Sequence, residues 1–301
     1  MMLFYTMTML LSLIGVLLSV AFFTLMERKI MGLMHFRKGP NKISVLGILQ
    51  PMSDAMKLFT KESTKLQQSK MFLFYFGPSF SLLIMMVYWL NYESINSMFF
   101  NKMKIFLILS ILSLSTFSFT FSSWGSNSKY SILGGYRAIS QTISYEICLS
   151  IFLLTLFYTN KSFSVQKLFM MKESWSMLMV SLPLFLTWIL LCLAELNRAP
   201  FDMSEGESEI VSGFNIEYGG SLFAFIFIAE YGMILFLSFF TSLMFLNKQF
   251  MLLKILLVGF IFILSRCSFP RMRYDALMFL CWKILLPYSL ILLMFFLMLF
   301  F

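Results

Sequence analysis

Residues 221–246 read SLFAFIFIAEYGMILFLSFFTSLMFL, a run of 26 residues in which Glu230 is the one charged side chain. A helix needs about 20 mostly apolar residues to cross the hydrocarbon layer of a membrane. The apolar residues here are continuous and do not alternate with polar ones, which favours a helix over a barrel strand. This stretch therefore predicts a transmembrane helix, and it decides the fold class.

The composition of the whole chain supports the same interpretation. The 301 residues are 59% hydrophobic and only 12% charged, whereas soluble domains carry about 25% charged residues. We predict an all-α polytopic integral membrane protein with about eight transmembrane helices. The expected spans are roughly 2–26, 71–91, 104–123, 141–159, 177–194, 221–246, 252–269 and 283–301.

The loops between these spans are short. The longest, 27–70, has 44 residues and is too short for a soluble domain, so residues 1–301 are expected to form a single transmembrane domain. Span 104–123 is rich in Ser and Thr. Small hydroxyl residues allow helices to approach closely, and we favour this interpretation over a polar pore.

Charge predicts the orientation of the chain. We number each loop by the expected span that it follows, so that the loop after the first span is loop one. Of the 23 Lys and Arg residues, 16 fall in or beside the odd-numbered loops. These loops are therefore expected on the matrix or cytoplasmic side. Eleven of the 14 acids lie on the same side. The net charge of +9 reflects the basic excess and predicts contact with anionic lipid, not with nucleic acid.

Segment 194–220, AELNRAPFDMSEGESEIVSGFNIEYGG, carries six acids and one base, Arg198. A solvated acidic loop is the ordinary interpretation, but the interleaved apolar residues indicate that this loop is packed and not free in solvent. Acids held close together in a partly dry place repel, so some of them bind protons near neutral pH and titrate together. Glu230 extends the row into the membrane. The six acids are Glu195, Asp202, Glu205, Glu207, Glu209 and Glu217.

Segment 47–62, GILQPMSDAMKLFTKE, predicts a short amphipathic helix along the membrane surface. Pro51 suits the first turn. Its apolar stripe consists of Met52, Ala55, Met56 and Phe59. Asp54 and Lys57 are either merely the solvated face of this helix, or the helix forms the floor of an entrance for a lipid-soluble ligand. Spacing does not decide between these two interpretations.

Three further segments bring charge to the same side: ERKIMGLMHFRKGPNK (27–42), SNSKYSILGGYRAISQTISYE (126–146) and FPRMRYDALM (269–278). Arg137 and Tyr145 are eight residues apart and would share one face of a continuous helix. Glu146, at the head of a span, should face protein or water. The alternative interpretation of Lys29, Arg266 and Arg271 is that they are ordinary anchors at the membrane interface.

The four cysteines and the single histidine offer little metal chemistry. No CxxC is present, and every cysteine lies in or beside an expected span. We predict that the cysteines are packing residues and that this chain alone holds no metal, haem or iron–sulfur cluster.

Taken together, these segments resemble the chain 1 family of NADH:ubiquinone oxidoreductase, or respiratory complex I, along nearly the whole chain and in order. The similarity is carried by ERK with RKGPNK, GILQPMSDAMKLF, SNSKY with QTISYE, NRAPFD with EGESE and SGFNIEY, and FPRMRYD. The resemblance implies a membrane subunit with no redox centre of its own. It also implies ubiquinone as substrate, with FMN, NADH and the iron–sulfur clusters bound by partner subunits.

The family further implies a quinone chamber closed by peripheral-arm subunits, and a carboxylate path that leads towards antiporter-like subunits. The residues expected at the chamber are Arg28, Arg37, Asp54, Met56, Phe59, Arg137, Arg198, Phe214 and Arg273. Those expected on the proton path are Tyr145, Glu146, Glu195, Glu205, Glu207, Glu209, Glu217 and Glu230.

Two other functions fit the same apolar chain. A stand-alone cation/proton antiporter would use the intramembrane acids as ligands, and transport by the purified chain would favour it. A plain membrane anchor would tolerate substitution of the acids. The 38 Phe and 26 Met residues hint at AT-rich codons, so we expect a multi-pass protein of the mitochondrial inner membrane whose odd-numbered loops face the matrix.

Overall fold

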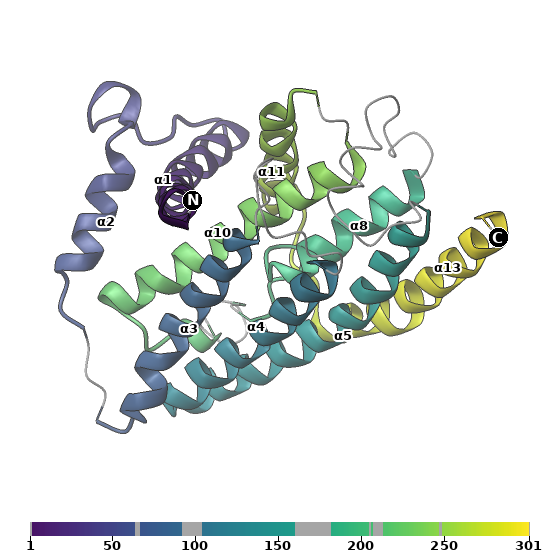
Figure 1. The fold of residues 1–301 in the computed structure, drawn as a ribbon. Helices are drawn as coiled ribbons and strands as arrows, with labels where there is room; N and C mark the ends of the chain where they lie inside the picture. The colour runs from purple at the N-terminus through teal and green to yellow at the C-terminus, as the bar shows by residue number, and fades with distance from the viewer. Residues whose placement is uncertain are drawn as a thin grey trace.

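The computed structural model describes residues 2–63, 67–91, 104–159, 182–204, 206, 213–246 and 249–300. The regular elements within these ranges are all helical (Figure 1). Seven of the described helices are long and apolar enough to cross a membrane. The prediction of an all-α polytopic membrane protein is therefore confirmed.

The seven long helices are α1 (Met2–Met34), α3 (Met71–Leu90), α4 (Lys104–Ser126), α5 (Lys129–Thr159), α10 (Gly220–Phe245), α11 (Met251–Ser268) and a last helix made of three parts. These parts are α12 (Tyr274–Phe279), a π-helical segment (Leu280–Leu285) and α13 (Leu286–Phe300). The eighth expected span, 177–194, corresponds to α8 (Leu182–Glu195), a shorter apolar helix. The first residues of that span lie outside the described ranges.

Helix α10 occupies the centre of the fold, and most of its side chains are buried. It packs against α1, α3 and α11, and α5 packs against α4, α8 and α13 (Figure 1). The predicted amphipathic helix is confirmed as α2 (Gln50–Thr60), with Pro51 in its first turn. This helix packs beside α1 and α10.

Several helices extend beyond the spans expected from hydropathy. Helix α1 continues past Glu27, because that buried carboxylate is paired with Arg266 of α11. The segment 126–146 does not simply link two spans but is mostly helical, since α5 begins at Lys129. Hydropathy misses these turns because their polar side chains find partners inside the protein.

Small residues bring α3, α4 and α5 close together. A Cβ atom on Gly77 would lie 2.8 Å from the backbone nitrogen of Ser122, and one on Gly125 would lie 2.6 Å from that of Phe74. On α5, a Cβ atom on Gly135 would overlap the side chain of Ser123 on α4, and one on Gly134 would lie 2.7 Å from the Cα of Gly213. Close packing of the Ser-rich helix α4 is therefore present, as the sequence suggested.

Candidate functional site: an interior cavity with two carboxyl groups

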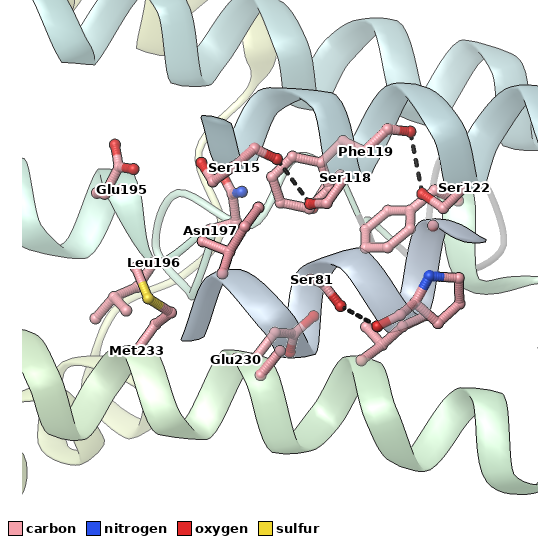
Figure 2. Close-up of a pocket in the computed structure, with 17 residues that line it drawn as sticks. Ser81, Ser115, Ser118, Phe119, Ser122, Glu195, Leu196, Asn197, Glu230 and Met233 are labelled. Atoms are coloured by element: carbon pink, nitrogen blue, oxygen red, sulfur yellow. Dashed lines mark hydrogen bonds between the residues drawn. The ribbon is translucent and has the colours of Figure 1, made fainter. Parts of the chain in front are cut away.

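A cavity with about 80 Å³ of space for water molecules lies between α3, α4, α10 and the end of α8. Glu195, the last residue of α8, and Glu230, in the middle of α10, both line it (Figure 2). One water molecule needs roughly 10–15 Å³ by this measure, so the cavity has room for several. Two acids that are 35 positions apart in sequence thus line the same cavity.

The remaining polar groups around the cavity are mostly serine hydroxyls. Ser81 donates to the Pro78 carbonyl at 2.8 Å, and its oxygen keeps lone pairs that can accept a proton donor from the cavity. Three serines of α4 also line the cavity, on the side of α4 that packs against α3. The polar residues at the cavity, apart from the two acids, are Ser81, Ser115, Ser118, Ser122, Asn197 and Ser204.

Asn197 lies at the cavity wall immediately after α8 (Figure 2). Its φ of 48° places it in the left-handed region, which Asn tolerates better than most residues. Its side-chain oxygen is buried and has no hydrogen-bond partner within the ranges that the structure describes. An acceptor of this kind, placed between two carboxyl groups along the wall, suits a bound water molecule.

Glu230 is held by a buried cation. Nη2 of Arg198 lies 3.0 Å from Oε2 of Glu230, and the Arg198 guanidinium also stacks 4.7 Å from the ring centroid of Tyr231. Downstream of Arg198, Asp202 is buried and pairs with Arg271 at 3.3 Å. The segment after α8 is thus fixed to α10 and to the segment before α12 by ion pairs.

Glu195 has a second acidic neighbour, Glu146 of α5, with which it interacts electrostatically. Both carboxyl groups also interact with the hydroxyl of Tyr88, at the end of α3. Tyr145 is fully buried beside Glu146, with its ring 6.1 Å from that of Phe201. Glu195 and Glu230 therefore share the cavity, and Glu146 lies within electrostatic range of Glu195.

Phe214 reaches the cavity because two backbones approach closely. The turn Gly213–Asn215 sits against Gly134 of α5, and the Phe214 ring meets that of Phe119 edge-on at 5.2 Å. The Tyr218 hydroxyl, a few residues later, donates to the carbonyls of Phe74 and Ser122 at 3.2 and 3.1 Å. Burial raises the pKa of the Tyr218 hydroxyl, so it remains a protonated donor.

The other predicted chamber residues lie elsewhere on the molecule. Arg28 of α1 pairs with Asp54 of α2 at 2.6 Å, and Gln50 donates to the same carboxylate at 2.9 Å. Met56 and Phe59 stay exposed on α2, at 72% and 52%. Phe59 also lies near Phe225 of α10, with ring centroids 6.3 Å apart.

Three predicted arginines are not drawn into the cavity. Arg37 is exposed after the end of α1. Arg273 pairs with Asp275, and both side chains are largely exposed, at 80% and 73%. Arg137 lies over the ring of Tyr274 at 5.8 Å.

The most acidic stretch of the sequence falls outside the described ranges. Glu205, Glu207 and Glu209 are the predicted path residues affected. Glu217 is described and is half-buried. Sequence reasoning missed Tyr88 and Asn197, because neither has a signal in its own neighbourhood: one lies in an apolar run and the other in a polar loop.

Comparison with known proteins gives a consistent result across the chain. A model of the family described as NADH dehydrogenase matches residues 7–297. The NADH-ubiquinone oxidoreductase chain 1 of Aedes aegypti is 44% identical over 298 residues, which cover 95% of each chain. The proteins of the same name from Sminthopsis macroura and Rhipicephalus sanguineus are 43% and 45% identical; the matches cover 95% and 92% of this chain and 93% and 88% of those proteins.

Proposed function

Because this chain belongs to the NADH dehydrogenase family and is a membrane subunit of NADH:ubiquinone oxidoreductase, we propose that it couples quinone reduction to proton translocation. It does so as one transmembrane domain that binds no redox centre itself. FMN, NADH and the iron–sulfur clusters belong to partner subunits, and ubiquinone is the substrate. Peripheral-arm subunits complete the quinone chamber, and antiporter-like membrane subunits receive the protons.

The observation that carries this proposal is the cavity shared by Glu195 and Glu230. Carboxyl groups inside a membrane protein are proton-relay candidates, and water molecules between them can pass protons on. Quinone reduction changes the charge beside the acidic loop, and protons then redistribute along Glu230, Glu195 and Glu146. The coupling is thus a charge switch that acts on a relay, with Glu205, Glu207, Glu209 and Glu217 as further proton holders.

The ion pair of Glu230 favours this function over a stand-alone cation antiporter. An acid that binds a transported cation must be able to exchange it, whereas Glu230 already faces the guanidinium of Arg198 at 3.0 Å.

Glu195→Gln tests the path directly. The amide keeps the shape of the side chain but cannot release a proton, so NADH:quinone reduction and proton pumping should fall together, by about tenfold or more. Reduction of an artificial acceptor at the peripheral arm should stay normal. The control is Glu93→Gln, which the charge pattern places on the opposite side of the membrane and which should be silent. Normal pumping by an assembled Glu195→Gln complex would refute the path.

Helix α2 supports the quinone part of the proposal. Its apolar side chains Met52, Met56 and Phe59 are exposed, and the ion pair between Arg28 and Asp54 ties the opposite side of the helix to α1. A surface helix with a free apolar stripe presents a suitable floor for a long isoprenoid tail that enters from the bilayer.

Placing a charge on this stripe is expected to block entry. Met56→Glu or Phe59→Asp should lower NADH:quinone reductase activity about fivefold or more, since the tail would have to pass an unpaired carboxylate. Artificial-acceptor reduction should survive. Lys57→Gln, on the same helix, is the control and should leave both activities unchanged. Equal loss of both activities in the Met56 and Phe59 variants would argue against a local quinone role.

The charge bias supports a multi-pass topology in the mitochondrial inner membrane with the odd-numbered loops in the matrix. Lys42 lies in an exposed segment between α1 and α2, and three of the four native cysteines are buried. A Lys42→Cys variant should react with an impermeant maleimide only in vesicles that expose the matrix face. Reaction from the opposite face would invert the proposed orientation.

A further inference from the structure

Tyr88, in the last turn of α3, has a buried hydroxyl that the packing of the fold does not explain. The residue is 0% exposed, and its hydroxyl has no hydrogen-bond partner within the ranges that the structure describes. Burying a hydroxyl without a partner costs roughly 1–3 kcal/mol, and phenylalanine would fill the same space without that cost. The hydroxyl therefore calls for a polar role.

The ring of Tyr88 is held in a fixed direction by α10. Its centroid lies 4.8 Å from that of Phe236. The indole of the next residue, Trp89, donates to the carbonyl of Gly232 at 3.2 Å. Gly232 in turn leaves room for Met85 of α3, whose Cγ would lie only 2.5 Å from an added Cβ. Because α3 and α10 are joined on both sides of the tyrosine, its hydroxyl cannot easily turn away.

Two carboxyl groups lie within electrostatic range of this hydroxyl. It interacts electrostatically with Glu195 at the end of α8 and with Glu146 on α5, and these acids also interact with each other. Glu195 lines the cavity that Glu230 shares, whereas Glu146 does not. The cavity can therefore connect Glu230 to Glu195, but it does not extend from Glu195 to Glu146.

We propose that Tyr88 is a relay residue of the carboxylate path, and that its hydroxyl joins Glu195 to Glu146 by hydrogen bonds made through bridging water molecules. This inference rests on the proposed function. A phenol suits the task because it has one proton to donate and lone pairs to accept another. The series of proton-carrying groups then has Tyr88 on α3, Glu146 on α5 and Glu195 on α8.

The transfer step balances without a cofactor or an oxidant. The carboxyl O–H bond of a protonated Glu195 breaks as its proton forms an O–H bond on a bridging water molecule, and that water passes one of its own protons to the Tyr88 oxygen. The original O–H bond of Tyr88 breaks in the same step, and that proton reaches the Glu146 carboxylate through a second water molecule, which gains one proton and gives up another. One proton has moved from Glu195 to Glu146, and Tyr88 keeps one proton throughout.

Tyr88→Phe in the assembled complex tests this role. The ring and its contact with Phe236 remain, and only the hydroxyl is lost. We expect kcat of NADH:quinone reduction and the pumping rate to fall about tenfold or more, which is the effect of losing one hydrogen bond to a charged group. KM for quinone should not change. The solvent deuterium isotope effect on kcat should rise, because proton transfer becomes the slow step, and a residue that only fills space would not change it.

Two parallel variants make the result decisive. Tyr75→Phe removes a hydroxyl from the exposed side of the same helix and should behave like the native complex. If Tyr88→Phe keeps native kcat and isotope effect while Glu195→Gln is slow, Tyr88 is only a packing residue and the inference is overturned. If Glu195→Gln is also normal, the carboxylate path itself fails, and the role of Tyr88 fails with it.

Discussion

Gly125→Ala is expected to abolish most of the assembled protein. The new Cβ atom would lie 2.6 Å from the backbone nitrogen of Phe74, 2.7 Å from its Cα and 2.8 Å from the carbonyl carbon of Leu73. All three are backbone atoms of α3, so no side chain can move aside and the two helices must separate. Overpacking of this kind costs about 1–3 kcal/mol and at times more.

The damage at Gly125 should spread, because the junction of α3 and α4 carries other contacts. The backbone nitrogen of Lys70 donates to the Gly125 carbonyl at 2.9 Å. Tyr218 stacks on Phe74 with ring centroids 4.4 Å apart, and its hydroxyl bridges the carbonyls of Phe74 and Ser122. Separation of the helices would weaken all of these contacts together.

The amount of folded complex, measured on a native gel and by its thermal midpoint in detergent, checks this prediction. The matched control is Gly15→Ala on α1, where an added Cβ would meet nothing within 4 Å. That change should be neutral or slightly stabilising, since alanine is the better helix former. A Gly125→Ala protein as stable as the Gly15→Ala protein would show that the helices are not in close contact.

Arg198→Met is expected to be the second large loss. The substitution removes a guanidinium that is 8% exposed and leaves the carboxylate of Glu230 without that partner. It also removes the stacking of the guanidinium on Tyr231. Removing one member of a fully buried ion pair costs about 3–5 kcal/mol, mainly because the remaining charge has lost its compensation. Glu230 is only partly buried, so the lower end of this range applies here. We expect low yield of the complex, and little pumping by whatever assembles.

A double variant separates the charge effect from the loss of packing. Glu230→Gln added to Arg198→Met removes the stranded charge, so the thermal midpoint should recover most of the loss. Pumping should remain low, because Glu230 belongs to the proposed path. Lys129→Met, at an exposed position, serves as the control for loss of a cation. If the double variant is no more stable than Arg198→Met, the ion pair is not what holds this segment.

The amphipathic helix and the long apolar helices could be predicted from sequence because each is specified by its own residues. Pro51, the stripe through Met56 and Phe59, and the run 221–246 all carry their signal within a few turns. Helix ends were predicted less well. The sequence places the end of the first span near residue 26, yet α1 continues to Met34, because the partner of Glu27 is Arg266, far along the chain.

The candidate site divides in the same way. The sequence identified Glu146, Glu195 and Glu230 as acids that membrane burial makes costly, and so marked them for function. It could not show that Glu195 and Glu230 face one cavity. Nor could it show that Arg198, expected at the quinone chamber, lies against Glu230. These relations join residues on different helices, and no local pattern encodes them.

The sequence by itself determined that this protein lies in a membrane, that it is helical, and to which family it belongs, because apolar length and motif order are properties of the chain alone. Only the tertiary structure decided which polar groups meet. Helix packing brings the hydroxyl of Tyr88, hidden in an apolar run, within electrostatic range of two acids from other helices. The physical reason is that burial and charge pairing depend on distances in space, and the glycine contacts between α3, α4 and α5 set those distances as much as the charged residues do.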